Sequence, residues 1–268
     1  MRKQTTTKLC AAIAALVTTS AFAGETVKCK TPKCASKSES AISKLSGEIE
    51  VGFVSGYTFR GQLLDSNPAL QVSLGAAVPF DVSGVGLDAG SVGFKTTQLF
   101  SQNVPNAGWF RSEVELGISL TKGLFTVTPS YQFFNSPTGQ FDSAHGFNLL
   151  VSAKDPIGLN PYVNGFFGVQ GNANNGTSTG AYYEFGINPT FALGKVSVGL
   201  PAAIGVGSRN YYKNNDSYGY TTVGVTASYP ILDNLSATAG VRYLNTSDSI
   251  NSGKENIITT TVGLGMTF

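Results

Sequence analysis

The sequence predicts an all-β protein, a transmembrane antiparallel up-and-down β-barrel of about twelve strands. Charged residues make up only 13% of the 268 residues, against about 25% in an average domain. No apolar run approaches the roughly 18 residues that a transmembrane helix needs. Instead, short segments alternate apolar with small or polar residues between turn-forming residues, which is typical of strands with one face in lipid and one facing a polar interior.

The first 23 residues have the features of a cleaved secretory signal peptide. Arg2 and Lys3 give a positive start, residues 9–17 are apolar, and Ala21-Phe22-Ala23 is a small-residue cleavage site. We therefore expect a mature chain from Gly24, carried across the inner membrane of a Gram-negative-type cell envelope.

Residues 24–46 form a predicted periplasmic leader that is rich in lysine and serine. Five lysines and two glutamates favour a loosely ordered segment and allow a weak contact with anionic cell-wall material. Cys29 and Cys34 lie close together in an oxidising compartment, which favours a local disulfide. Metal or redox chemistry is the alternative, although zinc would need two further ligands. We expect no metal and no cofactor.

The predicted barrel covers residues 47–268. Its strands alternate between short connections, expected on the periplasmic side, and longer ones, expected outside the cell. The predicted strands are 48–59, 69–80, 87–98, 109–120, 124–134, 145–153, 161–170, 181–193, 195–206, 217–229, 235–244 and 256–268. Strand 87–98 alternates poorly, whereas 109–120 alternates clearly.

The last predicted strand closes the barrel. One face is apolar or β-branched and the other is small and mostly polar, and we expect the strand to pair with residues 48–59. The apolar face includes Val262, Leu264, Met266 and Phe268.

Aromatic residues on the predicted outward faces fall into two belts, as expected of girdles at the two membrane interfaces. The outer belt contains Tyr57, Phe59, Phe110, Phe133, Tyr183 and Tyr243. The inner belt contains Phe80, Phe125, Phe191, Tyr229 and Phe268.

The same alternation directs seven charged side chains into the lumen, where they avoid lipid. They are Glu50, Arg60, Arg111, Glu113, Glu115, Glu184 and Arg242. Glu113 and Glu115 lie on one strand with side chains about 7 Å apart, so they either brace the barrel through ion pairs or line a charge-selective path. The barrel carries 10 basic and 14 acidic residues, a net charge of −4, which predicts a mild cation preference. The remaining inward residues are mostly Gly, Ser, Thr and Ala and leave room for a narrow pore.

Enzymatic and nucleic-acid functions have little support in the sequence. The single histidine, His145, lies near Asp142 and Ser143, but a serine–histidine site also needs an oriented nucleophile and an oxyanion site. No basic stripe points to nucleic acid. We therefore expect that the protein is not an enzyme, and keep an outer-membrane hydrolase as the less favoured alternative.

One motif resembles a known family. The segment Ser55-Gly56-Tyr57-Thr58-Phe59-Arg60-Gly61, followed by Pro68-Ala69-Leu70-Gln71, resembles the opening hairpin of TorF-type porins, and the chain is more weakly similar to MipA/OmpV-like barrels. The resemblance implies an outer-membrane channel for passive diffusion of small polar solutes or ions, surrounded by membrane lipid. It also implies that the aromatic closing strand is an assembly signal read by the barrel-insertion machinery. A non-conducting structural or adhesive barrel is the alternative.

Overall fold

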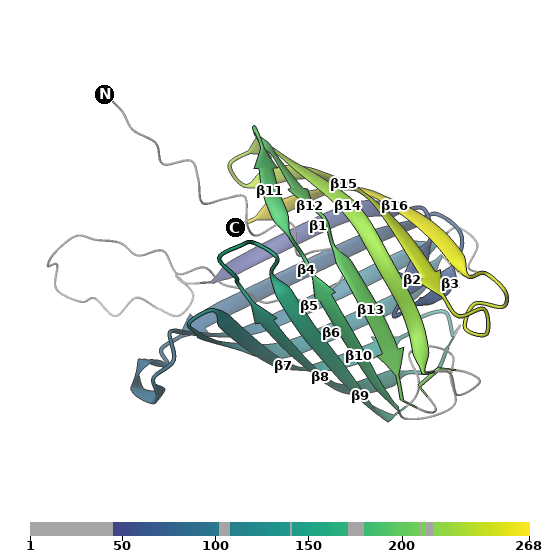
Figure 1. The fold of residues 1–268 in the computed structure, drawn as a ribbon, viewed down its shortest axis with the longest axis horizontal. Helices are drawn as coiled ribbons and strands as arrows, with labels where there is room; N and C mark the ends of the chain where they lie inside the picture. The colour runs from purple at the N-terminus through teal and green to yellow at the C-terminus, as the bar shows by residue number, and fades with distance from the viewer. Residues whose placement is uncertain (1–44, 102–107, 140, 171–179, 209–210, 213–216) are drawn as a thin grey trace, which may run out of the picture.

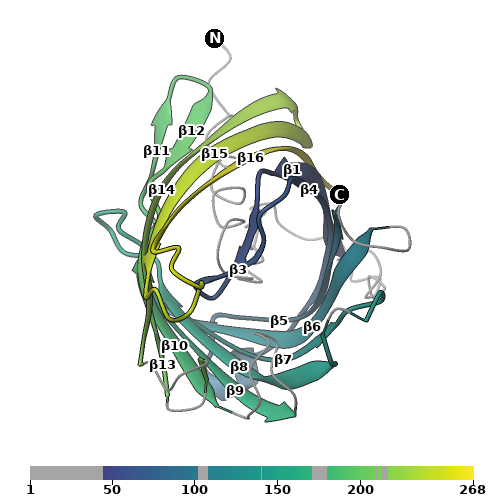
Figure 2. The ribbon, with the colours of Figure 1, turned by 90° about the vertical axis from the view of Figure 1, so that its right-hand side faces the viewer.

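The structure, a computed structural model, describes residues 45–101, 108–139, 141–170, 180–208, 211–212 and 217–268. These residues form one antiparallel barrel with a short hairpin inside it (Figures 1 and 2). The predicted signal peptide and the predicted leader up to residue 44, with Cys29 and Cys34, lie outside the described residues.

Sixteen strands account for nearly all of the regular structure that is described. They are β1 (Ser46–Val54), β2 (Tyr57–Phe59), β3 (Gln62–Asp65), β4 (Ala69–Phe80), β5 (Ala89–Ser101), β6 (Trp109–Lys122), β7 (Phe125–Asn135), β8 (Ala144–Ala153), β9 (Pro161–Gln170), β10 (Ala181–Ile187), β11 (Thr190–Leu193), β12 (Val196–Gly199), β13 (Ala202–Gly207), β14 (Tyr218–Leu232), β15 (Leu235–Thr246) and β16 (Asn256–Thr267). A 3-10 turn, η2 (Ser83–Val85), follows β4. None of the helices in the described part of the chain is long and apolar enough to cross a bilayer.

The predicted twelve-strand closed barrel is confirmed. β10 with β11 and β12 with β13 each form one barrel strand with a break, and β2 and β3 lie outside the barrel wall. β1 closes the barrel by pairing with both β4 and β16. Gly47 and Phe268 complete this seam through reciprocal backbone hydrogen bonds of 2.8 and 3.0 Å.

Prolines explain the two breaks. Pro189 precedes β11 and Pro201 precedes β13, and proline has no N–H with which to continue a ladder. The N–H of Leu200 donates to the carbonyl of Pro189 at 2.9 Å. The two breaks therefore lie opposite each other in neighbouring strands.

The two faces of the barrel differ as the alternation predicts. In β14, Val223 and Val225 are each 51% exposed on the outer face, whereas the intervening side of the strand contains Thr222, which is 4% exposed. All five residues of the aromatic belt predicted for the periplasmic end are exposed on the outside of the barrel. They are Phe80, Phe125, Phe191, Tyr229 and Phe268. At the opposite end, Phe133, Tyr183 and Tyr243 lie on the outward face.

Phe110 does not belong to the outer belt, so that prediction is wrong. A bulge between Leu99 and Phe100 places Phe110 out of register with the neighbouring strand. Its side chain is only 8% exposed and its ring packs 6.5 Å from that of Tyr57. Trp109, which is 40% exposed, takes the outward position and stacks on Phe100 at 6.0 Å.

The first predicted strand is also too long. The β1 ladder ends at Ser55, which exchanges hydrogen bonds of 2.9 Å with Thr260, and Tyr57 and Phe59 belong to the separate β2–β3 hairpin. Their side chains face the interior and not lipid, because this hairpin folds into the lumen (Figure 2). The prediction that Tyr57 and Phe59 form part of the outer belt is therefore wrong.

Candidate functional site: the barrel lumen

The β2–β3 hairpin crosses the lumen at the end of the barrel that carries the longer connections, called here the long-loop end (Figures 1 and 2). Phe59 pairs with Gln62, so Arg60 and Gly61 form a two-residue turn. Their φ angles are 49° and 87°, the two positive values of a type I′ turn. A Cβ at Gly61 would lie 2.6 Å from Cδ1 of Tyr220, so glycine allows the tip to approach that wall.

Side chains from two connections between strands hold the backbone of this turn. The hydroxyl of Tyr212 donates to the carbonyl of Arg60 at 2.8 Å, and Asn251 Nδ2 donates to the carbonyl of Gly61 at 2.8 Å. The N–H of Leu63 donates to Asn251 Oδ1 at 2.7 Å. Burial raises the pKa of the Tyr212 hydroxyl, so this group remains a proton donor at neutral pH.

The Arg60 side chain is enclosed by aromatic rings and two oxygen acceptors. Its guanidinium carbon lies 3.7 Å from the ring centre of Phe166 and 4.6 Å from that of Phe59. Its nitrogens donate to Tyr211 Oη at 2.9 Å and to Gln132 Oε1 at 2.8 Å. We call this surrounding set the guanidinium box, made of Phe59, Gln132, Phe134, Phe166, Tyr182 and Tyr211.

A second buried arginine lies beside the box. Arg111 is 0% exposed, its guanidinium carbon lies 3.9 Å from the ring centre of Phe59, and its Nε donates to Glu113 Oε1. The Tyr57 hydroxyl donates to the same carboxylate oxygen at 2.7 Å. Glu113 therefore links the wall strand β6 to the hairpin.

Aromatic and apolar side chains fill the rest of this level of the lumen. Tyr212 and Tyr182 are 1% exposed and Phe134 is 2% exposed. The buried cluster consists of Phe134, Ala144, Phe166, Tyr182, Tyr211, Tyr212, Tyr220, Leu244 and Ile257, with Phe59, Leu63, Phe141 and Ile250 packed against it. The narrow pore expected from small inward residues is thus filled by side chains at the long-loop end.

Glu184 is held by three tyrosines. It is 4% exposed and accepts hydrogen bonds from Tyr162 at 2.8 Å, from Tyr182 at 2.6 Å and from Tyr220. The carboxylate also interacts electrostatically with Arg242. Three hydroxyl donors from strands β9, β10 and β14 therefore satisfy this buried carboxylate within the wall.

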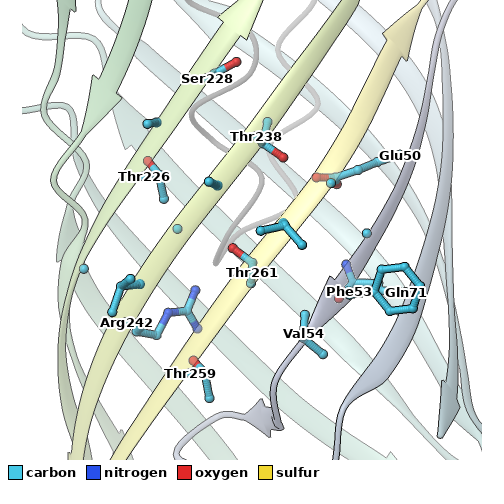
Figure 3. A pocket seen from close by; sticks show the side chains of 18 of the residues that line it. Glu50, Phe53, Val54, Gln71, Thr226, Ser228, Thr238, Arg242, Thr259 and Thr261 are labelled. Atoms are coloured by element: carbon cyan, nitrogen blue, oxygen red, sulfur yellow. The ribbon is translucent and has the colours of Figure 1, made fainter.

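A cavity of about 140 Å³ lies beneath the hairpin, against the wall formed by β1, β14, β15 and β16 (Figure 3). Gly56, Tyr57 and Thr58 of the hairpin segment line it from one side. Glu50 and Arg242 supply its charges, and most of its other lining residues are Gly, Ala, Ser or Thr. Its uncharged polar side chains include Gln71, Thr226, Ser228, Thr238, Thr259 and Thr261.

Six of the seven sequence-predicted lumen charges fall into three groups, and Glu115 lies apart from them. Arg60, Arg111 and Glu113 meet at the hairpin, Glu50 and Arg242 line the cavity, and Glu184 lies in the tyrosine cluster. Glu115 is 6% exposed and accepts a hydrogen bond from Ser130 at 2.5 Å. Arg60 differs from the others because it lies on the hairpin and not on a wall strand.

Several residues that face the lumen were not predicted from the sequence. Lys95 faces the lumen opposite Glu115 and lies 3.6 Å from Glu48 Oε1; the weak alternation of its strand concealed it. Tyr162, Tyr182 and Tyr220 share the inward parity of Glu184 in paired strands, and the alternation could have found them. Tyr211 and Tyr212 lie between strands, where no periodicity could have placed them.

His145 lies at the outer face of β8. It shares a hydrogen bond of 2.6 Å with the Tyr131 hydroxyl and contacts Gln170 Oε1 at 3.2 Å. The ring of Tyr131 also packs against Phe147 at 5.5 Å. Among the described residues, the hydrogen-bond partners of His145 are thus Tyr131 and Gln170 and not Asp142 or Ser143. Among the residues that the structure describes, no group of three or more His, Cys, Asp or Glu could hold a metal ion.

The apolar face of the closing strand points away from the lumen. Val262 is 56% exposed, Leu264 49%, Met266 39% and Phe268 57%. Their inward neighbours, Gly263 and Gly265, lie opposite Gly52 and Glu50 of β1.

The fold defines the class of protein as an outer-membrane β-barrel. An outer membrane channel from Pseudomonas putida F1 has a TM-score of 0.52 at 8% identity, covering 84% of this chain and 95% of that one. KdgM porin, in complex with disordered oligogalacturonate, has a TM-score of 0.49 at 14% identity over 83% of this chain and 99% of its own. The outer membrane phospholipase OMPLA of Salmonella typhi, a dimer with bound calcium, has 0.49 at 12% identity over 82% and 90%.

The likeness to the Pseudomonas putida channel supports the fold alone, because the identity is only 8%. No family model matches the chain, and no curated protein sequence matches it. The resemblance to TorF-type porins therefore rests on the hairpin motif.

Proposed function

We propose that this protein is an outer-membrane channel for passive diffusion of small polar solutes or ions, with the long-loop end outside the cell. The observation that carries the proposal is the cavity inside the closed barrel, which is lined by the charges of Glu50 and Arg242 and mainly by small residues, Gly, Ala, Ser and Thr (Figure 3). An inward face of this kind is typical of barrels that hold water in their lumen. On this proposal the hairpin motif makes the chain a TorF-type porin, delivered by a cleaved signal peptide and assembled through the Phe268 strand.

The wall charges support a mild cation preference. Five carboxylates of the wall strands face the lumen, those of Glu48, Glu50, Glu113, Glu115 and Glu184, against three cations, Lys95, Arg111 and Arg242, which leaves −2. Charges that line a pore bias which ions pass. Arg60 is counted apart because it belongs to the hairpin.

Single-channel recording in a planar bilayer tests the proposal. Protein that shows heat-dependent mobility on a detergent gel should give discrete conductance steps. The reversal potential in a salt gradient should then indicate preference for the cation. Anion preference would reject the selectivity, and absence of any conductance from folded protein would reject the channel.

A non-conducting structural barrel is the second candidate function. The packed aromatic cluster at the long-loop end favours it, because buried side chains fill the lumen at that level. Folded protein without conductance, even after the hairpin is removed, would establish this alternative.

Our proposal includes no hydrolytic activity. His145 is bonded to Tyr131 and Gln170, whereas a serine–histidine hydrolase needs the imidazole hydrogen-bonded to its nucleophilic serine. A phospholipid-cleavage assay on the wild type and on His145→Ala tests this. Activity that is lost in the variant would make the protein an enzyme.

A further inference from the structure

The tip of the lumen hairpin carries an arginine in a backbone conformation that arginine rarely adopts. Arg60 has a φ of 49° at the first central position of its turn, where type I′ turns favour Asn, Asp or Gly. Strain of this kind persists only where the surroundings impose it, and it often marks a functional position. An asparagine would form the turn more easily, so the feature that arginine adds is its guanidinium group.

The guanidinium box matches the shape and charge of that group. Phe166 presents its ring face at 3.7 Å, while Tyr211 and Gln132 present oxygens at 2.9 and 2.8 Å. A planar, weakly hydrated guanidinium can stack on rings and donate in its plane at the same time, whereas an ammonium cannot. Cation–π contacts are stronger where water is excluded, and here Phe166 is 4% and Tyr182 is 1% exposed.

The box also joins opposite sides of the barrel. The hairpin follows directly from β1, whereas the box residues on the wall come from β7, β9 and β10. In the ring of strands, β9 lies six places from β1 in either direction. The Arg60 side chain therefore ties the tip of the hairpin to the far wall.

We propose that the guanidinium box is a binding site for a guanidinium cation, occupied by Arg60, and that this occupancy locks the hairpin across the lumen. The inference rests on the proposed channel function. Loss of the Arg60 side-chain contacts weakens the attachment of the hairpin tip, which Tyr212 and Asn251 also hold, and favours opening of the long-loop end. When the Arg60 side chain is absent, a guanidinium ion from solution takes its place. The ion restores the packing between Phe59 of the hairpin and Phe166 of the wall.

Two substitutions separate the turn from its side chain. Arg60→Asn keeps a residue suited to the turn and removes the guanidinium, while Arg60→Lys keeps the charge and removes the planar group. We expect open probability to rise about tenfold or more in Arg60→Asn, as when a desolvated cation–π contact is lost. We expect a rise in Arg60→Lys as well, since the ammonium cannot make the same contacts.

Chemical rescue tests the site itself. Guanidinium chloride at about 20 mM, a level set by the millimolar affinities of single-contact ligands, should lower the open probability of Arg60→Asn toward that of the wild type. The same addition should raise its thermal unfolding midpoint, and sodium chloride at equal ionic strength should do neither. The wild type, whose box is filled, should respond equally to the two salts.

Failure of this inference differs from failure of the channel proposal. Equal open probability in the wild type and in Arg60→Asn would overturn the lock. Equal responses of Arg60→Asn to guanidinium and to sodium would overturn the binding site. Neither result would contradict the proposal that the barrel conducts. A folded variant with residues 57–65 replaced by a Gly-Ser linker provides the other arm. If it does not conduct, the channel function falls and the lock with it.

Discussion

At the scale of single residues, backbone conformation decides where the lumen charges lie. Gly61 has a φ of 87° and approaches Tyr220 closely. Tyr220 cannot easily move, because its hydroxyl is bonded to Glu184 and to Tyr182. The position of Arg60 therefore depends on the absence of a side chain at the next residue.

Gly61→Ala should destabilise the hairpin by more than the backbone penalty alone. A left-handed conformation costs an L-residue about 1–2 kcal/mol, and the new Cβ would also lie 2.6 Å from Tyr220 Cδ1. Gly123→Ala is the matched control, because its φ is also positive, at 58°, with no atom within 4 Å of the new Cβ. Urea unfolding in detergent micelles measures the free energy of unfolding of both variants. Equal decreases in the two variants would show that the close approach to Tyr220 does not affect stability.

At the scale of secondary structure elements, the barrel is not uniformly paired. The described part of β11 pairs with β12 alone, whereas β15 pairs with both β14 and β16. The hydrogen bonds between the β8–β9 connection and the next barrel strand end at Asn188. The N–H of Asn188 donates to the carbonyls of Leu159 and Asn160 at 2.9 and 3.3 Å. Beyond Pro189, β11 and β12 extend as a hairpin at the end of the barrel opposite the long-loop end (Figure 1).

Amide hydrogen exchange should distinguish these elements. Strands with one unpaired edge open locally at lower cost than strands paired on both sides. We expect residues 190–193 to exchange faster than residues 235–246 when followed by mass spectrometry in micelles. Equal protection of the two segments would mean that another part of the chain covers the β11 edge.

At the scale of the whole molecule, the alternation of side chains along each strand separates the lipid-facing residues from the lumen-facing residues around the barrel. Val225 is 51% exposed on the outer face at the middle of β14, and the next residue, Thr226, lines the cavity. Adjacent residues of one strand therefore meet two different solvents.

Arginine substitutions at these two neighbours should have different effects. Val225→Arg should cost about 2–4 kcal/mol of folding free energy in a bilayer, because the charge faces hydrocarbon near the midplane. Thr226→Arg should fold at nearly the wild-type level and shift the reversal potential toward anions, because its charge enters the cavity. Folding titrations in lipid vesicles measure the first effect. Similar losses at both positions would contradict the assigned faces.

The sequence by itself determined the barrel, its twelve strands and the two faces of nearly every strand. Side chains alternate with a period of two for local steric reasons, and charge on the lipid face is costly, so a single strand reveals its own orientation. Glu50, Glu113, Glu115, Glu184 and Arg242 could be directed inward on this basis alone. Phe110 could not be placed, because a bulge breaks the period.

Only the tertiary structure decided what fills the lumen. The motif from Tyr57 to Gly61 alternates like a strand, yet it leaves the wall and meets residues from β6, β7, β9 and β10. Which inward side chains touch depends on the register between distant strands and on where a loop folds, and no local pattern encodes either. For that reason the alternation could identify Arg60 as an inward charge, whereas its place in an aromatic box on the far wall required the closed barrel.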